Sequence, residues 1–426
     1  MLCADLDLSS RPLVIEPPWD VRPPLSGEIA RKFRLETIFS CCKWDPQVGD
    51  QPAFTDFPLI ISRGTWRMLA TQAEALAKET EAIEKRLMDA PDSWRILGLP
   101  RGVRRALAAK KPPAAAMFRV MRFDFHLTDN GWQISEVNSD VPGGFVEASG
   151  MTKLMAALHH DCEITGDPAM AIAAAFRRRL PEGATVGLIH ATAYIDDRQA
   201  MVILSRHLEN AGLRPVLLSP ANVEWREGHA YSVARWHQGE LAALFRFFPA
   251  EWLPNLERRV GWNHYFRGAC TPCANPGWSL LSQSKRFALA AEQIGAWNGH
   301  WRLLQPETRD PRQIKAAEAA EWVLKPALGR VGEDIGLAGV TQGKNLRAIR
   351  RHARWRPARW ASQRRFRALP IATHRGPLFP CLGVYVIDGL AAGIYGRIAA
   401  RPLIDNCAQD IAVLMPRETA QTSTNL

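Results

Sequence analysis

One segment dominates the reading of this chain: Arg122-Phe-Asp-Phe-His-Leu-Thr-Asp-Asn-Gly-Trp-Gln-Ile-Ser-Glu-Val-Asn-Ser-Asp140. It predicts two β-strands joined by a tight turn, because Asn130 and Gly131 tolerate the positive φ that hairpin turns require. Alternation along the first strand puts Arg122, Asp124 and His126 on one face, with the apolar residues between them on the other.

The second strand of this hairpin carries a matching set of polar side chains. Glu136, Asn138 and Asp140 are expected to share a face, while Ile134 and Val137 supply the apolar positions. Carboxylate and amide oxygens suit a hard cation such as Mg²⁺, and a neighbouring arginine suits a phosphate bound to it. An amphipathic hairpin with a solvated polar face would show the same pattern.

Two later segments carry basic groups at strand ends. In the segment 322–335 a short apolar strand ends at Lys325, followed by a loop with Gly329 and Gly332. The ammonium group can reach nucleotide phosphates, and glycines let backbone N–H groups approach them closely. In the segment 384–397 the dipeptide Asp388-Gly389 predicts a second hairpin, with Arg397 near the end of its return strand.

Together these segments resemble the synthetase domain of glutathionylspermidine synthase, an ATP-grasp ligase with circularly permuted order. The match covers about residues 115–415. The family's Arg-x-Asp and Glu-x-Asn-x-Asp-x-Pro motifs correspond to Arg122, Asp124, Glu136, Asn138, Asp140 and Pro142. Its Lys-Pro-x-x-Gly-Arg-x-Gly loop corresponds to Lys325, Pro326, Gly329, Arg330 and Gly332, and its last hairpin to Asp388, Gly389, Ala392, Gly393 and Arg397.

The resemblance implies an α/β fold: an ATP-grasp core in permuted order plus a smaller parallel-sheet lobe of the pre-ATP-grasp kind. We expect residues 1–115 to form a mostly helical segment and residues 116–150 the first part of the core. Residues 151–280 would form the parallel-sheet lobe and residues 281–426 the remainder of the core. The lobe has its own sequence signal, a strand at 184–190, a helix at 196–211 and a strand at 213–218.

The resemblance also implies ATP and Mg²⁺ as cofactors and assigns roles to particular residues. Asp124, Glu136 and Asn138 would hold the metal, and Arg122 and Arg397 would be catalytic. Nucleotide binding would involve Lys285, Lys325, Gly329, Arg330 and Gly332, with Gln363 at the adenine-facing hinge. The expected reaction is ATP-dependent joining of a carboxylate to an amine through an acyl phosphate. By resemblance the acid is glutathione and the amine a polyamine.

The chain departs from the family pattern near its end. Ile398 stands where the family often has an acidic residue after the last arginine, and the polar segment that follows is altered around residues 406–410. A nucleotide-binding protein that has lost turnover therefore remains an alternative.

The composition of the chain limits where the protein is expected to act and suggests one further alternative function. The hydrophobic content of 47% and the absence of a long apolar run predict a cytoplasmic protein with no membrane partner, and the eight cysteines are expected to be reduced. The formal net charge is +11, and nine arginines lie within residues 347–367, interleaved with Trp355 and Trp360. This run fits a solvated helix face, attraction of an anionic substrate, or, less favoured, nucleic-acid binding.

Helix patterning is clearest in the first segment. Residues 65–88 are rich in Ala, Glu and Leu and predict a long helix, and residues 92–110 predict a second, basic helix. A further helix is expected at 285–296 and a strand at 322–325. His190, Asp196 and Asp197 follow the first strand of the parallel lobe, at the edge where such sheets bind ligands. A purely structural role would explain these residues equally well, with the aspartates capping the helix and the histidine hydrogen-bonded within the fold.

Overall fold

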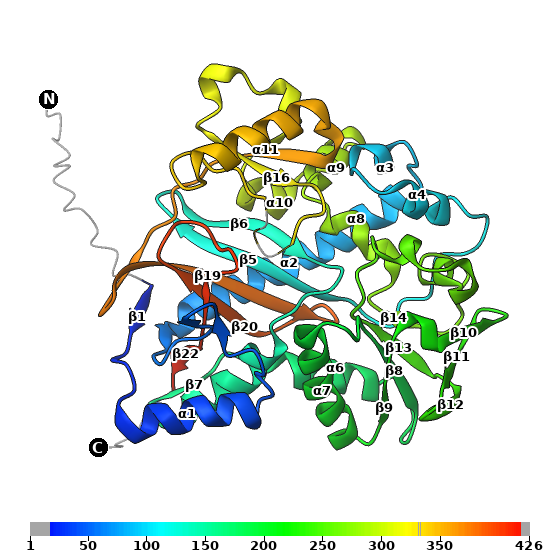
Figure 1. Ribbon diagram of the computed structural model, residues 1–426, viewed down its shortest axis with the longest axis horizontal. Helices are drawn as coiled ribbons and strands as arrows, with labels where there is room; N and C mark the ends of the chain where they lie inside the picture. The colour runs from blue at the N-terminus through cyan, green and yellow to red at the C-terminus, as the bar shows by residue number, and fades with distance from the viewer. Residues whose placement is uncertain (1–17, 331, 333, 419–426) are drawn as a thin grey trace, which may run out of the picture.

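The computed structural model of the protein describes residues 18–330, 332 and 334–418, and its centre is an antiparallel sheet. The strand order is β21 (Gln409–Ile411), β20 (Leu390–Ala399), β19 (Gly376–Ile387), β5 (Val120–Thr128) and β6 (Gly131–Asn138), with β18 (Ile371–Thr373) paired to β19. The long helix α2 (Arg63–Met88) packs against β19 and β20 (Figure 1). Both predicted hairpins and the long helix are confirmed.

The β5–β6 hairpin contains an irregularity that the sequence pattern did not predict. Asp124 lies opposite Glu136, whereas Phe125 lies opposite Ile134, so Ser135 is an extra residue in β6. Such a bulge shifts the alternation by one position. It allows Ile134 and Val137, three residues apart, both to be buried on the core side.

A second, smaller sheet lies above the central one and carries α11 (Gly343–Trp355) on one face (Figure 1). Its order is β15 (Thr308–Arg309), β17 (Trp360–Arg364) and β16 (Trp322–Pro326). Leu324 of β16 packs with Ile349 and Ala353 of α11, which leaves the alternate residues of β16 facing the other way. The helix expected at 285–296 is shorter, with α9 at Phe287–Gln293 between α8 (Leu280–Gln283) and α10 (Gly299–Leu304).

The third part is a parallel sheet in the order β14, β13, β8 and β9 (Cys273–Ala274, Ala243–Arg246, Thr185–Ile189 and Arg214–Leu218). The connection between β8 and β9 is α7 (Ile195–Asn210), which confirms the predicted strand–helix–strand unit. Helix α6 (Pro168–Arg177) packs beside α7, and a meander of β10 (Val223–Arg226), β11 (His229–Ala234) and β12 (His237–Glu240) flanks the lobe.

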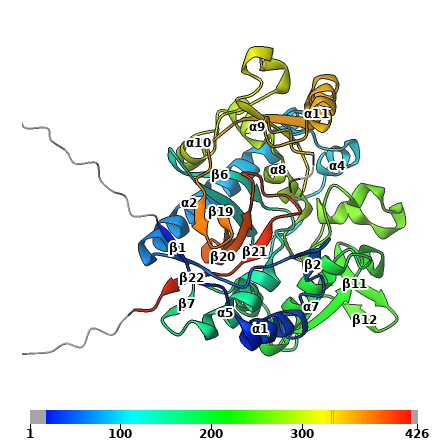
Figure 2. The same cartoon turned by 60° about the vertical axis from the view of Figure 1, so that its left-hand side comes forward.

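A fourth sheet joins distant parts of the chain. Its order is β1 (Trp19–Val21), β4 (Leu59–Ile61), β22 (Val413–Pro416) and β7 (Cys162–Ile164). Figure 2 shows the blue strand β1 and the red strand β22 in this region, above α1 (Gly27–Phe39). Three of the four expected segments thus contribute strands to one sheet, and their division at 115, 150 and 280 stays a prediction.

The second basic helix expected at 92–110 is wrong as a single element. It is divided into α3 (Ser93–Ile96) and α4 (Arg101–Leu107). The break occurs because Gly98 adopts φ +72° and Pro100 takes an extended conformation before α4. Seven cysteines in the described residues are free thiols. No helix among those residues is long and apolar enough to cross a membrane.

Candidate functional site

A cleft of about 630 Å³ lies where the central sheet, the smaller sheet and the parallel-sheet lobe meet. Nine of the eleven predicted site residues line it: Arg122, Asp124, Glu136, Asn138, Lys325, Arg330, Gly332, Gln363 and Arg397. Lys285 and Gly329 are not among the lining residues, and Lys285 Nζ donates to the carbonyl of Gly329 at 2.8 Å. Residues 331 and 333, within the glycine loop, lie outside the described residues.

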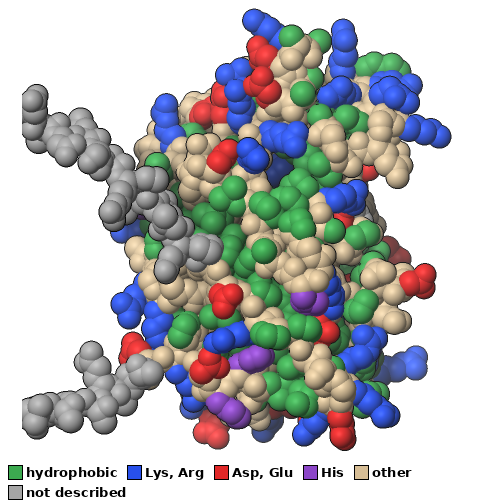
Figure 3. All heavy atoms as spheres, turned by 90° about the vertical axis from the view of Figure 1, so that its left-hand side faces the viewer, with side chains coloured by type: hydrophobic (Ala, Val, Ile, Leu, Met, Phe, Trp, Pro, Cys, Tyr) green, Lys and Arg blue, Asp and Glu red, His purple; other side chains and the backbone are tan. Residues whose placement is uncertain are grey.

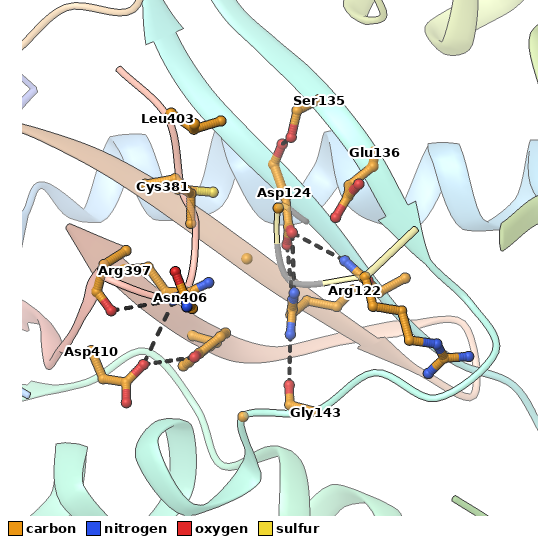
Figure 4. Close-up of a pocket in the computed structure, with 18 of the residues that line it drawn as sticks. Arg122, Asp124, Ser135, Glu136, Gly143, Cys381, Arg397, Leu403, Asn406 and Asp410 are labelled. Carbon is orange, nitrogen blue, oxygen red and sulfur yellow. Dashed lines mark hydrogen bonds and ion pairs between the residues drawn. The ribbon is translucent and has the colours of Figure 1, made fainter. Parts of the chain in front are cut away.

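The β5–β6 hairpin presents the predicted oxygen ligands together. Asp124 and Glu136 are direct partners across the two strands, as are Arg122 and Asn138. Arg122 binds both carboxylate oxygens of Asp124, at 2.8 and 3.1 Å, and donates to the carbonyl of Gly143 at 2.6 Å (Figure 4). Asn138 Nδ2 lies 3.0 Å from Asp124 Oδ2. The donor set of two carboxylates and an amide therefore fits a hard cation.

Gly383 of β19 makes room for this arrangement. It lies opposite Asp124 on the neighbouring strand. A Cβ atom at position 383 would come within 2.7 Å of Arg122 Cδ and 2.9 Å of Asp124 Oδ1. The absence of a side chain on β19 thus permits the arginine and the aspartate to lie flat over the central sheet.

The electrostatics of the cleft depend on Glu136 and two lysines. Burial alone would raise the pKa of Glu136, but Lys285 and Lys325 outweigh it and hold the pKa at about 2. The Lys285 Nζ lies 3.1 Å from a Glu136 carboxylate oxygen. Burial lowers the pKa of Lys325 to about 8, although Glu136 partly offsets it. The cleft holds an ionised carboxylate beside an ammonium group whose pKa is about 8.

Lys325 is held in place by polar contacts from two strands. Its Nζ donates to Gln363 Oε1 at 2.6 Å and to the carbonyl of Ser135, the bulge residue, at 3.0 Å. Nearby His126 contacts Ser135 Oγ at 3.1 Å and packs against Phe366. Burial, with Lys325 as a second cause, lowers the pKa of His126 to about 4, so it is neutral at pH 7.

Arg330 and Asp140 form a separate ion-pair network. Arg330 binds both carboxylate oxygens of Glu251 at 2.8 and 3.0 Å and Asp140 at 3.2 Å. Asp140 is fully buried, binds Arg246 at 2.5 Å and accepts from the backbone N–H of Ala250. The expectation that Asp140 shares the polar face of Glu136 and Asn138 is wrong, because β6 ends at Asn138 and the chain turns into the lobe.

Arg397 reaches the cleft from β20 opposite Cys381. Its Nη2 donates to the carbonyls of Asp405 and Ala408 at 2.7 and 3.2 Å, which fastens the altered segment around 406–410 to the sheet. Figure 4 shows Arg397, Asn406 and Asp410 on the same side of the site. Ile398, the next residue, is buried in the core on the other face of β20.

A second charged cluster, which the sequence motifs do not predict, also lines the cleft. Lys43, from the N-terminal segment, forms ion pairs with Glu147 and with Asp410, the latter at 3.1 Å. Asp410 also accepts from the Tyr395 hydroxyl at 2.6 Å, and the Tyr395 ring lies under the Arg122 guanidinium. No local pattern around Lys43 signals this role, because the contacts form only between distant segments.

Acidic side chains occupy the lobe side of the cleft. Asp45, Asp196 and Asp197 line it, and burial raises the pKa of Asp197 to about 6. His190 is buried, and its Nδ1 contacts the carbonyl of Leu188 at 3.2 Å rather than the cleft. Among the described residues, no group of three or more His, Cys, Asp or Glu side chains could hold a metal by itself.

Two solved structures are similar to this chain to different degrees. A glutathione synthetase-like effector from Globodera pallida is similar over 91% of this chain and 97% of its own, with 11% identity and a TM-score of 0.58. A putative gamma-glutamylcysteine synthetase from Methylobacillus flagellatus matches 75% of this chain and 82% of its own, with 12% identity and a TM-score of 0.40. No curated protein matches the sequence significantly.

The family comparison covers most of the chain. The model described as glutathionylspermidine synthase preATP-grasp matches residues 60–415. This span includes all three motif segments, and the first structural likeness agrees with it at the level of the fold. The predicted α/β fold, an ATP-grasp core in permuted order with a parallel-sheet lobe, is confirmed. The chain belongs to the glutathionylspermidine synthase pre-ATP-grasp family.

Proposed function

We propose that this protein is an ATP-dependent carboxylate–amine ligase that forms an amide bond through an acyl phosphate. Family membership supports a ligase-type function. The observation that carries the finer proposal is the convergence of an acidic pair, Asp124 and Glu136, with the cations Arg122, Lys325 and Arg397 in one cleft. Its volume of about 630 Å³ is in the range of small-molecule sites.

Mg²⁺ fits the acidic pair, with Asp124, Glu136 and Asn138 as its protein ligands. When bound, it would supply neutralisation of phosphate charge. The low pKa of Glu136 keeps this ligand ionised at any physiological pH. Lys325 and Lys285 would then bind phosphate oxygens.

The proposed reaction has two steps. A carboxylate oxygen of the acid attacks the γ-phosphorus of ATP, the bond to the β-phosphate oxygen breaks, and ADP leaves. The amine nitrogen then attacks the acyl carbon, loses a proton, and inorganic phosphate leaves. Such transfer depends on positioning and charge stabilisation rather than on a covalent side chain. Arg122 and Arg397 would bind the transferring group, and Arg122 is oriented by Asp124 and Gly143.

The substrates remain those implied by the resemblance, glutathione as the acid and a polyamine as the amine. The acidic lobe side of the cleft, with Asp45, Asp196 and Asp197, supports a cationic amine in that half. The free thiols support a cytoplasmic location as part of the same proposal.

The competing possibility is a nucleotide-binding protein that has lost turnover. Two departures from the family pattern suggested it, Ile398 and the altered segment at 406–410, and the position of Ile398 in the structure makes the first a weaker argument. Ile398 packs in the core rather than in the cleft, so an acid missing there removes no cleft-lining group. The altered 406–410 segment still supplies Asp410, which lies in the cleft.

The decisive test uses an isotope. The protein is incubated with Mg-ATP, a polyamine and glutathione labelled with ¹⁸O in its carboxylates, and the released phosphate is analysed by mass spectrometry. Transfer of one ¹⁸O atom to phosphate is expected, because the acid's oxygen stays on phosphorus when the amide forms. Amide formation without label transfer would exclude the acyl phosphate. Binding of ATP with no release of ADP, across a panel of acid–amine pairs, would favour the nucleotide-binding alternative.

A further inference from the structure

One segment of this protein carries as much positive charge as the whole chain has in net excess, and a shorter basic run without acidic residues lies at 93–123. Residues 335–387 contain eleven lysines and arginines and no aspartate or glutamate, which equals the whole formal net charge of +11. In the rest of the chain 43 basic residues balance 43 acidic ones. A solubilising charge would be spread over the surface, whereas a segregated one marks an electrostatic binding surface.

The cations of this segment are largely unpaired. Arg364 pairs with Glu321 at 2.8 Å and Arg375 with Asp56 at 2.7 Å. The other nine form no ion pair with any residue in the described part of the chain: Lys344, Arg347, Arg350, Arg351, Arg354, Arg356, Arg359, Arg365 and Arg367. All nine are exposed. We call these nine residues the basic face.

Helix α11 organises the basic face. Its apolar residues Ile349 and Ala353 pack against Leu324 and Trp360 of the smaller sheet. The basic residues therefore occupy the outer, exposed surface of the helix. Figure 2 places α11 at the upper right of the molecule, and in Figure 3 basic side chains gather there in blue. Since Lys325 and Gln363 of the same sheet line the cleft, α11 covers the opposite face. Of the nine basic-face residues only Arg365 lines the cleft, and the other eight lie outside its lining.

We propose that the basic face binds the backbone of a single-stranded nucleic acid. Eight of its nine cations are arginines, whose planar guanidinium groups bind phosphate in a bidentate manner. Trp355, at the end of α11, has 76% of its surface exposed and offers a platform on which an unpaired base can stack. A membrane surface fits less well, because membrane-binding helices insert an apolar face and that of α11 is already buried.

The test is fluorescence anisotropy with a labelled 20-residue oligouridylate, using the full-length protein at 50 to 300 mM NaCl. We compare the wild type with the triple variant Arg347→Gln, Arg351→Gln, Arg354→Gln. The matched control, Arg31→Gln, Lys78→Gln, Arg105→Gln, removes the same charge from exposed positions outside the segment. We expect the first triple variant to bind at least tenfold more weakly, with a salt slope shallower by about 2, and the control to lose far less.

Two further measurements make the assignment specific to nucleic acid. Trp355→Ala should weaken binding by roughly tenfold without changing the salt slope, because it removes stacking and no charge. Equal losses in the two triple variants, or no binding at 100 mM NaCl, would overturn the proposal. Binding to phosphatidylserine vesicles or to polyaspartate but not to the oligonucleotide would overturn it too, in favour of a membrane or an acidic protein. ATP binding, measured in parallel, reports separately on the ligase site.

Discussion

Lys43 Nζ lies 3.1 Å from Asp410 Oδ2 and also contacts Glu147, so a lysine near the start of the chain is enclosed by carboxylates from its middle and its end. All three side chains are almost fully buried. Burial would lower the pKa of Lys43, but Asp410 and Glu147 outweigh it and hold the pKa well above its usual value. This ion-pair cluster joins the N-terminal segment to β21, the neighbour of the strand β20 that carries Arg397 and Tyr395.

Replacing Lys43 with methionine should destabilise the protein strongly. The change leaves Glu147 without the cation it pairs with and leaves Asp410 only the more distant Arg397, at 3.9 Å. Breaking a buried ion pair in this way typically costs about 3–5 kcal/mol. The free energy of unfolding, measured in urea, reports this loss. Lys32→Met is the matched control, because Lys32 forms an exposed pair with Glu36 at 3.9 Å and should change stability by less than about 1 kcal/mol. Similar losses in both variants would contradict the importance of the buried cluster.

Glu136→Gln should remove metal-dependent nucleotide binding. The amide keeps the shape of the side chain but loses the charge that a cation requires. In the wild type we expect Mg-ATP at a hundredfold excess over Kd to stabilise the fold by about 2.7 kcal/mol, a shift of a few degrees in Tm. In the variant, Mg-ATP should shift Tm no more than ATP with EDTA does. Glu224→Gln, on an exposed strand of the lobe, should respond like the wild type.

Lys325 predicts opposite effects of pH on binding and on stability. Its pKa is lowered to about 8, so kcat/KM for ATP should fall as pH rises above about 8, where the folded enzyme loses this charge. Between about pH 8 and pH 10.5 the unfolded chain binds the proton and the folded chain does not, so the contribution of Lys325 to stability should rise with pH. Lys325→Arg should abolish both trends, since arginine does not titrate in this range. A wild-type kcat/KM that stays constant to pH 10 would exclude Lys325 from phosphate binding.

The glycine loop offers a matched pair of substitutions. Gly332 adopts φ +68°, and a Cβ there would lie 2.4 Å from the carbonyl oxygen of Ile404, whereas Gly339, at φ +79°, has nothing within 4 Å. Alanine at either position carries the cost of a left-handed conformation, about 1–2 kcal/mol. Only Gly332→Ala should also displace the segment near residue 404, which lines the cleft, and thereby raise KM for ATP. If this displacement weakens ATP binding by about 1.4 kcal/mol, KM rises roughly tenfold. Equal KM values in the two variants would show that this close approach has no role in binding.

Several local elements follow from the order of residues alone, although the helix expected at 92–110 is divided in two. Asp388 and Gly389 both adopt positive φ in the turn between β19 and β20, as the Asp-Gly dipeptide predicts. The strand–helix–strand unit at 184–218 and the long helix α2 are also predicted by the sequence. Hydrophobic periodicity and turn preferences depend on residues close together in the chain, so they can be recognised without the tertiary structure. The resemblance to a permuted ATP-grasp ligase also rested on short motifs, and nine of the eleven residues chosen from it line one cleft.

Contacts between segments that are distant in the chain could not be predicted from the sequence. The bulge at Ser135, the turn that carries Asp140 away from Glu136, and the binding of Arg330 by Glu251 each depend on which strand or lobe lies alongside. Lys43 shows the same limit most clearly, since its two carboxylate partners lie more than a hundred residues away in the chain. Turn and strand preferences come from backbone sterics within a few residues, but burial and ion pairing depend on what the folded chain brings within a few ångströms.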